Sequence, residues 1–341
     1  MPTSSVGTLG RADDMQDLQR LRTAPLDVLT VEAPLLLVVR RREEIADGVV
    51  RFHLGRADGE RLPEWSPGTH ISLQLPSDVQ RQYSLCGEPS DAETWSIAVQ
   101  RDQSSRGGSV WLHDHVAPGA ELEVTHVRNN FELEVAQKYI FVAGGIGITP
   151  LVSMVRAARA AGAPWRMLYG GRSRTSMAFL NDFSARAEVE IRAEDECGRP
   201  DLVGYLGEPR SDTLIYACGP EGMLDALREA TSDWPAGSLR VERFTAPEAG
   251  EEAGSFVVEL AQSKKELEVG PEQSILDAVR ASGVDAMSSC EEGTCGTCET
   301  RVLAGVPEHR DVVLSEADRA SNRYMMICVS RCRGERLVLD L

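Results

Sequence analysis

The sequence lacks any apolar run approaching the roughly 20 residues that cross a bilayer. Its first 34 residues are polar and have no apolar core of the kind that a secretory signal carries. Basic residues are also in the minority, with 36 Lys and Arg against 53 Asp and Glu, so the net charge is −17. Binding to nucleic-acid phosphates needs a basic surface. We therefore expect a cytoplasmic protein that binds neither membranes nor nucleic acid, and whose acidic surface either serves plain solubility or steers a basic partner.

Two paired C-x2-C knuckles, the usual mark of a structural zinc site, are also missing. Eight scattered cysteines in 341 residues do not resemble the disulfide framework of a small secreted domain either. Four of the cysteines instead follow the plant-type [2Fe–2S] spacing, C-x4-C-x2-C with a distant fourth. They are Cys290, Cys295, Cys298 and Cys328. Cys332 is the alternative fourth ligand, and its loss should leave the cluster intact if Cys328 is the true one.

Glycines between these cysteines favour the same interpretation. Gly293 and Gly296 allow the positive φ angles with which a backbone wraps closely around a cluster. Backbone N–H groups turned inward can hydrogen-bond the sulfurs and tune the reduction potential. The four cysteines therefore predict a one-electron carrier, which needs a donor and an acceptor.

The length suits about two or three domains. Residues 246–254 are small and acidic without apolar periodicity, as in a linker. We expect a cluster domain at 255–341, two further domains at 35–137 and 138–245, and an N-terminal extension, 1–34, of unknown role. In the last domain Ser274 should cap a helix between strands near 256–260, 300–303 and 337–339.

The middle domain alternates strands and helices. Strands are predicted at 139–143, 165–169 and 213–217, each ending in a glycine-rich loop, with a helix at about 151–161. This pattern predicts a doubly wound α/β domain whose nucleotide-binding crevice lies at the carboxyl ends of the strands. Cys218 should lie at the floor of that crevice or serve as a small buried apolar residue.

The first domain has short alternating strands near 49–54, 69–75 and 95–100, separated by Pro and Gly turns. Such spacing predicts a small antiparallel barrel. Arg81 offers a guanidinium for a phosphate, and Gly107-Gly108-Ser109 should open a helix whose N–H groups face the same anion. Ordinary surface groups on a strand are the alternative reading of Arg81 to Ser84.

From residue 35 onward the chain resembles the phthalate dioxygenase reductase and vanillate demethylase reductase family. The resemblance rests on the order of its motifs: Arg81-Gln82-Tyr83-Ser84-Leu85-Cys86, Arg106-Gly107-Gly108-Ser109, Val142 to Pro150, Cys218-Gly219-Pro220, Glu242-Arg243-Phe244, and the four cysteines. It implies an antiparallel β-barrel flavin domain, a doubly wound α/β nucleotide domain and a β-grasp-like α+β plant-type ferredoxin domain.

The family binds FMN rather than FAD, so the resemblance implies FMN here. Arg81 and Ser109 would hold the phosphate, Tyr83 would pack on the isoalloxazine, and Ser84 would approach N5. Phe244 would lie beside the flavin. The full expected set is Arg81, Gln82, Tyr83, Ser84, Val99, Gln100, Arg106, Gly107, Gly108, Ser109 and Phe244.

The same resemblance places a nicotinamide nucleotide beside the flavin. The expected contacts are Gly144, Gly145, Gly147, Thr149, Pro150, Arg172, Ser173, Arg174, Cys218, Gly219 and Pro220. The loop at 171–176 has no acidic residue for a ribose 2′-hydroxyl, and its basic and hydroxyl groups suit a 2′-phosphate. The family habit favours NADH, which we predict, with NADPH as the alternative.

Together these features predict an NAD(P)H-dependent flavin and iron–sulfur oxidoreductase with no catalytic residues beyond those that position its cofactors (Ser84, Cys218 and Phe244). It would deliver electrons to a Rieske-type oxygenase. A cytochrome P450 is the alternative acceptor, and a non-catalytic redox sensor is the third hypothesis. We expect the 290–298 loop to face the partner protein. The sequence identifies neither that partner nor the compound it oxidises.

Overall fold

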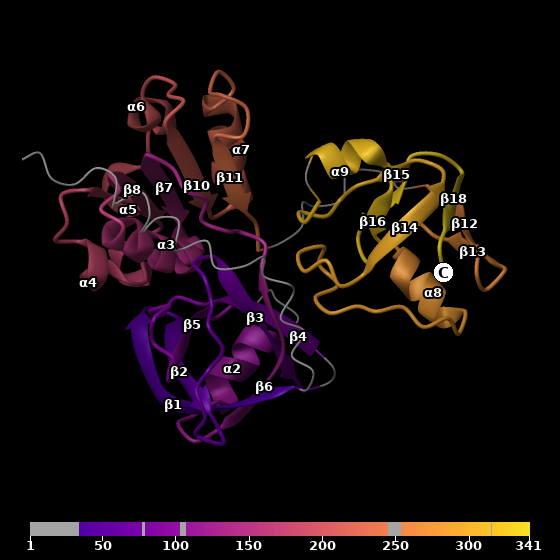
Figure 1. The fold of residues 1–341 in the computed structure, drawn as a ribbon, viewed down its shortest axis with the longest axis horizontal. Helices are drawn as coiled ribbons and strands as arrows, with labels where there is room; N and C mark the ends of the chain where they lie inside the picture. Colours follow the sequence, from indigo (N-terminus) through magenta and orange to yellow (C-terminus); the bar gives the residue numbers. More distant parts are fainter. Residues whose placement is uncertain (1–33, 77–78, 103–106, 245–253, 315) are drawn as a thin grey trace, which may run out of the picture.

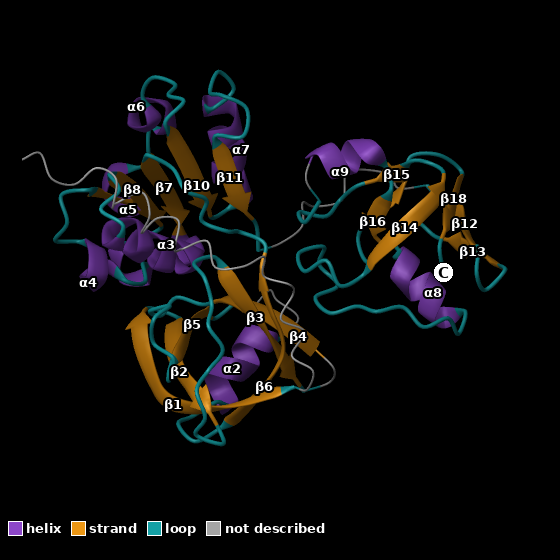
Figure 2. Ribbon diagram, viewed as in Figure 1, coloured by secondary structure: helices purple, strands orange, loops and turns teal. Residues whose placement is uncertain are grey.

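The computed structural model describes residues 34–76, 79–102, 107–244, 254–314 and 316–341, and it contains three domains (Figure 1). Residues 246–253 of the expected linker at 246–254, residues 1–33 of the extension at 1–34, and Arg106 lie outside the described residues. Figure 2 shows a curled sheet with one helix, a parallel sheet with helices on its faces, and a smaller mixed sheet with a helix against it. Within the described part of the chain, no helix is long and apolar enough to cross a membrane.

The first domain is a curled six-stranded antiparallel sheet in the order β4-β3-β6-β1-β2-β5. A bridge between Leu85, which follows β4, and Ile97 on β5 links the two ends of the sheet. Its inward side chains, including Phe52, Leu73 and Trp95, are fully buried. The strands are β1 (Leu35–Ala46), β2 (Val49–Arg56), β3 (Thr69–Leu75), β4 (Val79–Ser84), β5 (Trp95–Gln100) and β6 (Glu121–Asn129).

One helix, α2 (Gly108–His115), follows β5 as the Gly-Gly-Ser sequence predicted. Gly107 precedes it with a φ of 89°, a left-handed angle that favours glycine. The His113 ring bonds the carbonyl oxygen of Val99 on β5, 2.9 Å away, which fixes the helix to the sheet. The last turns of α2 are thereby held beside the end of β5.

The second domain is a five-stranded parallel sheet in the order β11-β10-β7-β8-β9. Its strands are β7 (Lys138–Gly144), β8 (Trp165–Gly171), β9 (Val189–Ala193), β10 (Thr213–Cys218) and β11 (Leu239–Glu242). Its helices are η1 (Gly145–Gly147), α3 (Ile148–Ala160), η2 (Arg174–Ser176), α4 (Leu180–Phe183), α5 (Glu194–Cys197), α6 (Leu202–Leu206) and α7 (Glu221–Ala230). β7, β8 and β10 agree with the sequence prediction. It missed β9 and β11 because these short edge strands alternate with charged residues.

The third domain is a five-stranded mixed sheet in the order β13-β12-β18-β14-β16, with β12 and β18 parallel. Its elements are β12 (Phe256–Leu260), β13 (Lys265–Val269), α8 (Ile275–Ala281), β14 (Glu299–Ala304), β15 (Pro307–Glu308), α9 (Glu316–Ser321), β16 (Tyr324–Met326), β17 (Arg331–Cys332) and β18 (Arg336–Leu339). The Ser274 hydroxyl accepts a hydrogen bond from Asp277 N at 3.0 Å, so the predicted cap of α8 is confirmed. The loop that carries Cys290, Cys295 and Cys298 lies between α8 and β14, and we call it the ligand loop.

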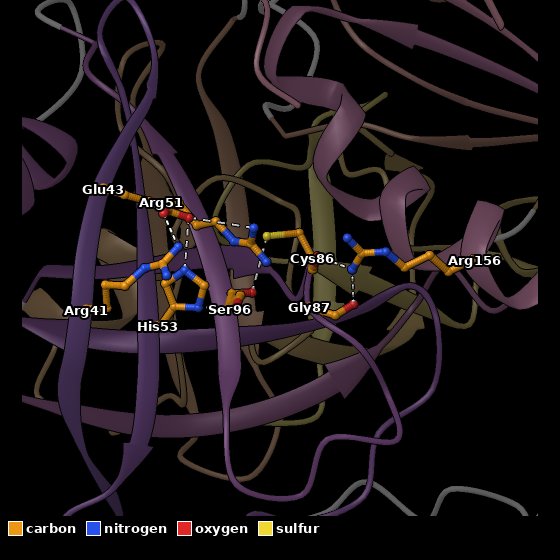
Figure 3. Close-up of polar contacts among 8 residues, drawn as sticks. All are labelled: Arg41, Glu43, Arg51, His53, Cys86, Gly87, Ser96 and Arg156. Atoms are coloured by element: carbon orange, nitrogen blue, oxygen red, sulfur yellow. Dashed lines mark hydrogen bonds and ion pairs between the residues drawn. The ribbon is translucent and has the colours of Figure 1, made fainter. Parts of the chain in front are cut away.

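Polar contacts join the first and second domains (Figure 3). Arg156 on α3 donates to the carbonyl oxygens of Cys86 and Gly87, at 3.1 and 2.8 Å. Behind Cys86, Ser96 Oγ lies 3.2 Å from His53 Nδ1, and His53 Nε2 lies 3.0 Å from Glu43. The helix that opens the nucleotide crevice is therefore fastened to the strand ends of the barrel.

Candidate functional site

A cavity of about 290 Å³ lies where the three domains meet. This is near the lower end of the volumes found for small-molecule sites. The barrel contributes His70, Gln80, Arg81, Gln82, Tyr83, Ser84, Ala98, Gln100, Asp102, Ser109 and Asn130. The second domain contributes Ile146, Thr149, Val241, Glu242, Arg243 and Phe244, and the third Cys290, Glu292, Thr294, Val312 and Val313.

Most of the residues expected at the flavin line this cavity. They are Arg81, Gln82, Tyr83, Ser84, Gln100, Ser109 and Phe244. Val99 instead points into the barrel core, where it is 1% exposed. Gly107 and Gly108 lie just behind the wall: a Cβ on Gly108 would come within 2.7 Å of Arg81 Cγ, so glycine makes room for the Arg81 side chain.

One end of the cavity is suited to an anion. Arg81 Nη1 donates to the Gln80 carbonyl at 2.8 Å, whereas its Nη2 is buried without a partner among the described residues. A buried guanidinium nitrogen left unpaired is costly, and an anion would satisfy it. The N-terminus of α2 lies beside it, and Ser109 Oγ also accepts from Asp102 N at 3.1 Å. These groups fit a phosphate.

The wall next to this end carries polar atoms suited to a flavin ring. Burial and the nearby Arg128 lower the pKa of His70 to about 4, so its imidazole is neutral, and its buried Nε2 has no partner in the described part of the chain. Gln82 Nε2 is buried and unpaired as well. Burial raises the pKa of Tyr83, which keeps its phenol neutral. Unpaired donors and acceptors fit the nitrogens and carbonyls of an isoalloxazine.

The glycine-rich loops of the second domain meet at the opposite side. A Cβ on Gly147 would lie 2.3 Å from the Cys218 carbonyl oxygen, and one on Gly144 would lie 2.5 Å from Pro220 Cδ. Only glycine permits these approaches. Gly145 and Gly147 form η1, Thr149 and Pro150 begin α3, and Gly219 follows Cys218 at the end of β10. Of these loop residues only Thr149 lines the cavity, together with Ile146.

A buried thiol and a partly buried carboxyl lie at the floor of this crevice. Cys218 is 1% exposed and pairs in register with Glu242 on β11. Burial raises the pKa of Cys218, so it remains a thiol, and raises that of Glu242 to about 8. Glu242 Oε2 is unpaired among the described residues and faces the cavity. Glu242 was absent from the expected contacts, although it stands two residues before Phe244.

The loop after β8 lies away from the cavity. Arg172 is exposed, and Ser173 caps η2. Arg174 Nε lies 2.9 Å from both carboxylate oxygens of Glu196 on α5. Arg174, one of the basic residues that suited a 2′-phosphate, is thus already paired with the carboxylate of Glu196.

The four predicted cluster cysteines come together in the third domain, each at most 7% exposed. Their thiols contact in two pairs, Cys290 with Cys295 and Cys298 with Cys328. Hydrogen bonding within the pairs lowers the pKa of Cys295 to about 5 and lowers that of Cys298. Two pairs, rather than one group of four, fit a cluster with two irons, each bound by two thiolates.

The backbone around these thiols fits a cluster as well. Glu292 N and Thr294 N lie 3.3 and 3.4 Å from Cys290 Sγ, and Thr297 N lies 3.4 Å from Cys295 Sγ. Gly293 and Gly296 have φ angles of 69° and 79°, as the spacing predicted. Cys332 lies on β17, where its sulfur accepts from Gly334 N at 3.2 Å. The chain thus offers inward N–H donors to the thiolates.

The ligand loop contacts the barrel as well as the cavity. Cys290, Glu292 and Thr294 line the cavity, and Thr294 Oγ1 donates to Gln82 Oε1 at 3.2 Å. Ser289 donates to Gln80 and Arg128 to the carbonyl of Cys295. Part of the loop thus packs on the barrel, and that the loop faces a partner stays a prediction. These contacts form only when the domains pack, so no local sequence signal identifies them.

Comparisons with known proteins support the domain content of the chain. The family model of the 2Fe-2S iron-sulfur cluster binding domain matches residues 258–333. The chain is 40% identical over 313 residues to the phthalate 4,5-dioxygenase oxygenase reductase subunit of Pseudomonas putida, covering 89% of this chain and 96% of that protein.

Two solved structures resemble the whole chain. Phthalate dioxygenase reductase, described as a modular structure for electron transfer from pyridine nucleotides to [2Fe–2S], matches with a TM-score of 0.71 and 34% identity, over 91% of this chain and 99% of that one. An intact type IV self-sufficient cytochrome P450 monooxygenase matches with a TM-score of 0.81 and 42% identity. This match covers 94% of our chain but only 43% of the longer one.

Proposed function

Because the chain belongs to the phthalate dioxygenase reductase family, we propose that it carries electrons from a reduced nicotinamide nucleotide to a partner oxygenase. The observation that carries the proposal is the single cavity bounded by the barrel, the nucleotide domain and the ligand loop. A flavin bound there would accept a hydride and release its electrons one at a time to the cluster. The chain's own residues bind and orient these groups.

We propose FMN as the flavin. Arg81 Nη2 and the N-terminus of α2 offer one anion site at the end of the cavity, which suits a single phosphate. Ser84 and Tyr83 would contact the ring, and Phe244 would cover its nucleotide-facing side, where it is 40% exposed. Neutral His70 and Gln82 would bond the ring's polar atoms without adding charge.

The nicotinamide would enter between η1 and the loop after β10. Gly144, Gly147 and Gly219 let these loops contact each other closely. The Thr149 hydroxyl donates to the Ile146 carbonyl oxygen at 3.0 Å, which fixes the conformation of the first loop. Burial raises the pKa of both Cys218 and Glu242, which favours their neutral forms at the floor of the crevice.

We propose NADH as the donor. Glu196 neutralises Arg174, and Glu194 and Asp195 add exposed negative charge beside the same loop. These carboxylates oppose a 2′-phosphate more than a 2′-hydroxyl. Glu196→Gln should therefore lower the preference for NADH over NADPH in kcat/KM several-fold, and an unchanged ratio would contradict this assignment.

The partner we propose is a Rieske-type oxygenase, because the Pseudomonas putida relative is a reductase subunit of a dioxygenase. A cytochrome P450 is the second candidate, since the P450 chain contains a region similar to almost all of this chain. Titrating oxygenases of both kinds against the reduced protein separates the two candidates.

The test of the core proposal is anaerobic addition of NADH to the purified protein. The flavin absorption and then the cluster absorption should bleach, and cytochrome c should be reduced. Arg81→Ala should lose flavin and retain the cluster, whereas Arg61→Ala, an exposed arginine elsewhere on the barrel, should retain both. A protein that remains oxidised with NADH and NADPH would refute the reductase assignment, and full flavin occupancy in Arg81→Ala would refute the phosphate site.

A further inference from the structure

Arg128, at the end of β6, reaches from the barrel to the ligand loop. Its Nη1 donates to the carbonyl oxygen of Cys295 and to Thr297 Oγ1, the latter at 3.0 Å. Thr297 in turn contacts the Cys295 sulfur twice, through its N–H at 3.4 Å and its Oγ1 at 3.2 Å. A single guanidinium therefore joins the flavin-side domain to the hydrogen-bonding groups around one cluster sulfur.

Arg128 also neighbours a residue that lines the flavin cavity. Arg128 pairs in register with His70, which lines that cavity. After burial, the charge of Arg128 is the second cause that lowers the pKa of His70, and it acts likewise on His126. The imidazole of His70 is neutral as a result, and an arginine stays charged under all ordinary conditions. A fixed positive charge therefore lies between the flavin cavity and the cluster ligands.

We propose that Arg128 is a positioning residue for electron entry into the cluster. It holds the 289–297 loop against the flavin cavity, and its charge stabilises the cluster site when that site gains an electron. The inference rests on the proposed function. One electron leaves the flavin and one arrives at the cluster, so the site becomes more negative by one unit while Arg128 itself gains and loses nothing. A cation held in a partly buried position favours that state.

Uncharged side chains also hold the 289–297 loop on the barrel. Substituting one of them tests the positioning role of Arg128 apart from its electrostatic role. Ser289 donates to Gln80, and Thr294 donates to Gln82 at 3.2 Å. Removing the Ser289 hydroxyl weakens the docking contact without changing charge. Loss of the Ser289 hydroxyl should slow electron entry into the cluster only. Loss of Arg128 should slow electron entry and also shift the electron equilibrium between flavin and cluster.

The experiment uses the full-length protein loaded with flavin and cluster, as wild type, Arg128→Gln, Arg128→Lys, Ser289→Ala and Arg61→Gln. The cluster's midpoint potential is measured by electron paramagnetic resonance during titration with chemical reductants. Stopped-flow absorption after NADH mixing then follows flavin reduction and cluster reduction as separate phases. Arg61→Gln removes one positive charge from an exposed loop of the barrel.

In Arg128→Gln we expect the flavin–cluster electron equilibrium to move about tenfold away from the cluster, which is about 59 mV for a one-electron couple. The cluster phase should slow by at least as much while the flavin phase keeps its wild-type rate. Arg128→Lys, which keeps the positive charge, should have the wild-type midpoint potential of the cluster. Ser289→Ala should keep the potential, and Arg61→Gln should keep both quantities.

If the flavin–cluster electron equilibrium constant of Arg128→Gln lies within twofold of the wild-type value, the electrostatic role is overturned. A cluster potential in Arg128→Lys that differs from the wild-type potential overturns it as well. If Arg128→Gln does not load its cluster, Thr297→Val keeps the charge but removes the side-chain acceptor, and an unchanged cluster phase there overturns the positioning role. Because the potentials need no NADH, a wild-type protein inert to NADH would remove the proposed function and leave this test readable.

Discussion

Gly147→Ala should slow hydride transfer from NADH, because the added methyl group pushes two loops of the nucleotide crevice apart. The added methyl would lie 2.3 Å from the Cys218 carbonyl oxygen and 2.4 Å from its carbonyl carbon. Both neighbours are backbone atoms at the end of a central strand, so they cannot rotate away. The φ of Gly147 is −61°, an angle that alanine adopts freely, so the whole effect is steric.

The size of the effect follows from the geometry. An ordinary contact begins near 3.4 Å, so the two loops must separate by about 1 Å. Overpacking of this kind costs about 1–3 kcal/mol. A displacement of about 1 Å in groups that position reactants can cost about 100-fold in rate. We therefore expect hydride transfer from NADH to fall roughly 100-fold.

The assay is single-turnover flavin reduction by NADH, with flavin and cluster content measured on the same sample. Both contents should stay close to those of wild type, because the main core of the barrel and the core of the third domain are separate from the core around β7 and α3, to which the barrel adds Val49, Cys86, Ala98 and Phe131. Gly170→Ala is the matched control, since a Cβ there would meet its nearest atoms at 3.8 and 3.9 Å. Wild-type hydride transfer in Gly147→Ala, or equal losses in both variants, would refute the reasoning.

Two other predictions concern buried groups. Glu242 has a pKa raised from 4.5 to about 8 by burial, so the folded protein keeps a proton that the unfolded chain releases. The free energy of unfolding of the nucleotide domain should therefore fall as the pH rises from about 4.5 to 8, and Glu242→Gln should flatten this dependence in denaturant titrations at several pH values. An unchanged slope in the variant would argue against a buried, protonated Glu242. Cys328→Ser should abolish the cluster's absorption and paramagnetic signal, and Cys332→Ser should preserve them. The opposite result would exchange the two residues as fourth ligand.

Local patterns explain which parts of the fold the sequence predicted. The bounds of β3 and β5 match their predicted ranges, because apolar and polar residues alternate there between clear turn signals. The edge strand β11, Leu-Arg-Val-Glu, carries too few apolar residues to stand out in the sequence. Its burial depends on β10, whose register it follows.

The candidate site divides in the same way. Spacing alone brought Cys290, Cys295 and Cys298 together, because the ligands of a tight loop are close in sequence. His70, Asn130 and Val313 reach the cavity from separate elements and have no motif around them. Packing between domains decides their position, and a pattern read along one chain segment does not contain that information.

The direction of the ligand loop changes where the partner should be sought. In this arrangement Arg128 and Gln82 hold residues 294–297 on the barrel, so that part of the ligand loop faces the barrel. A protein bound to the described domains as they stand therefore meets other faces of the third domain. Those faces include the acidic edge formed by Glu259 and Glu266, each about half exposed and paired with Arg336. Substitutions that weaken partner binding but leave cluster reduction intact are thus expected outside residues 289–297, and finding them only within that loop would mean that the barrel must release the loop before delivery.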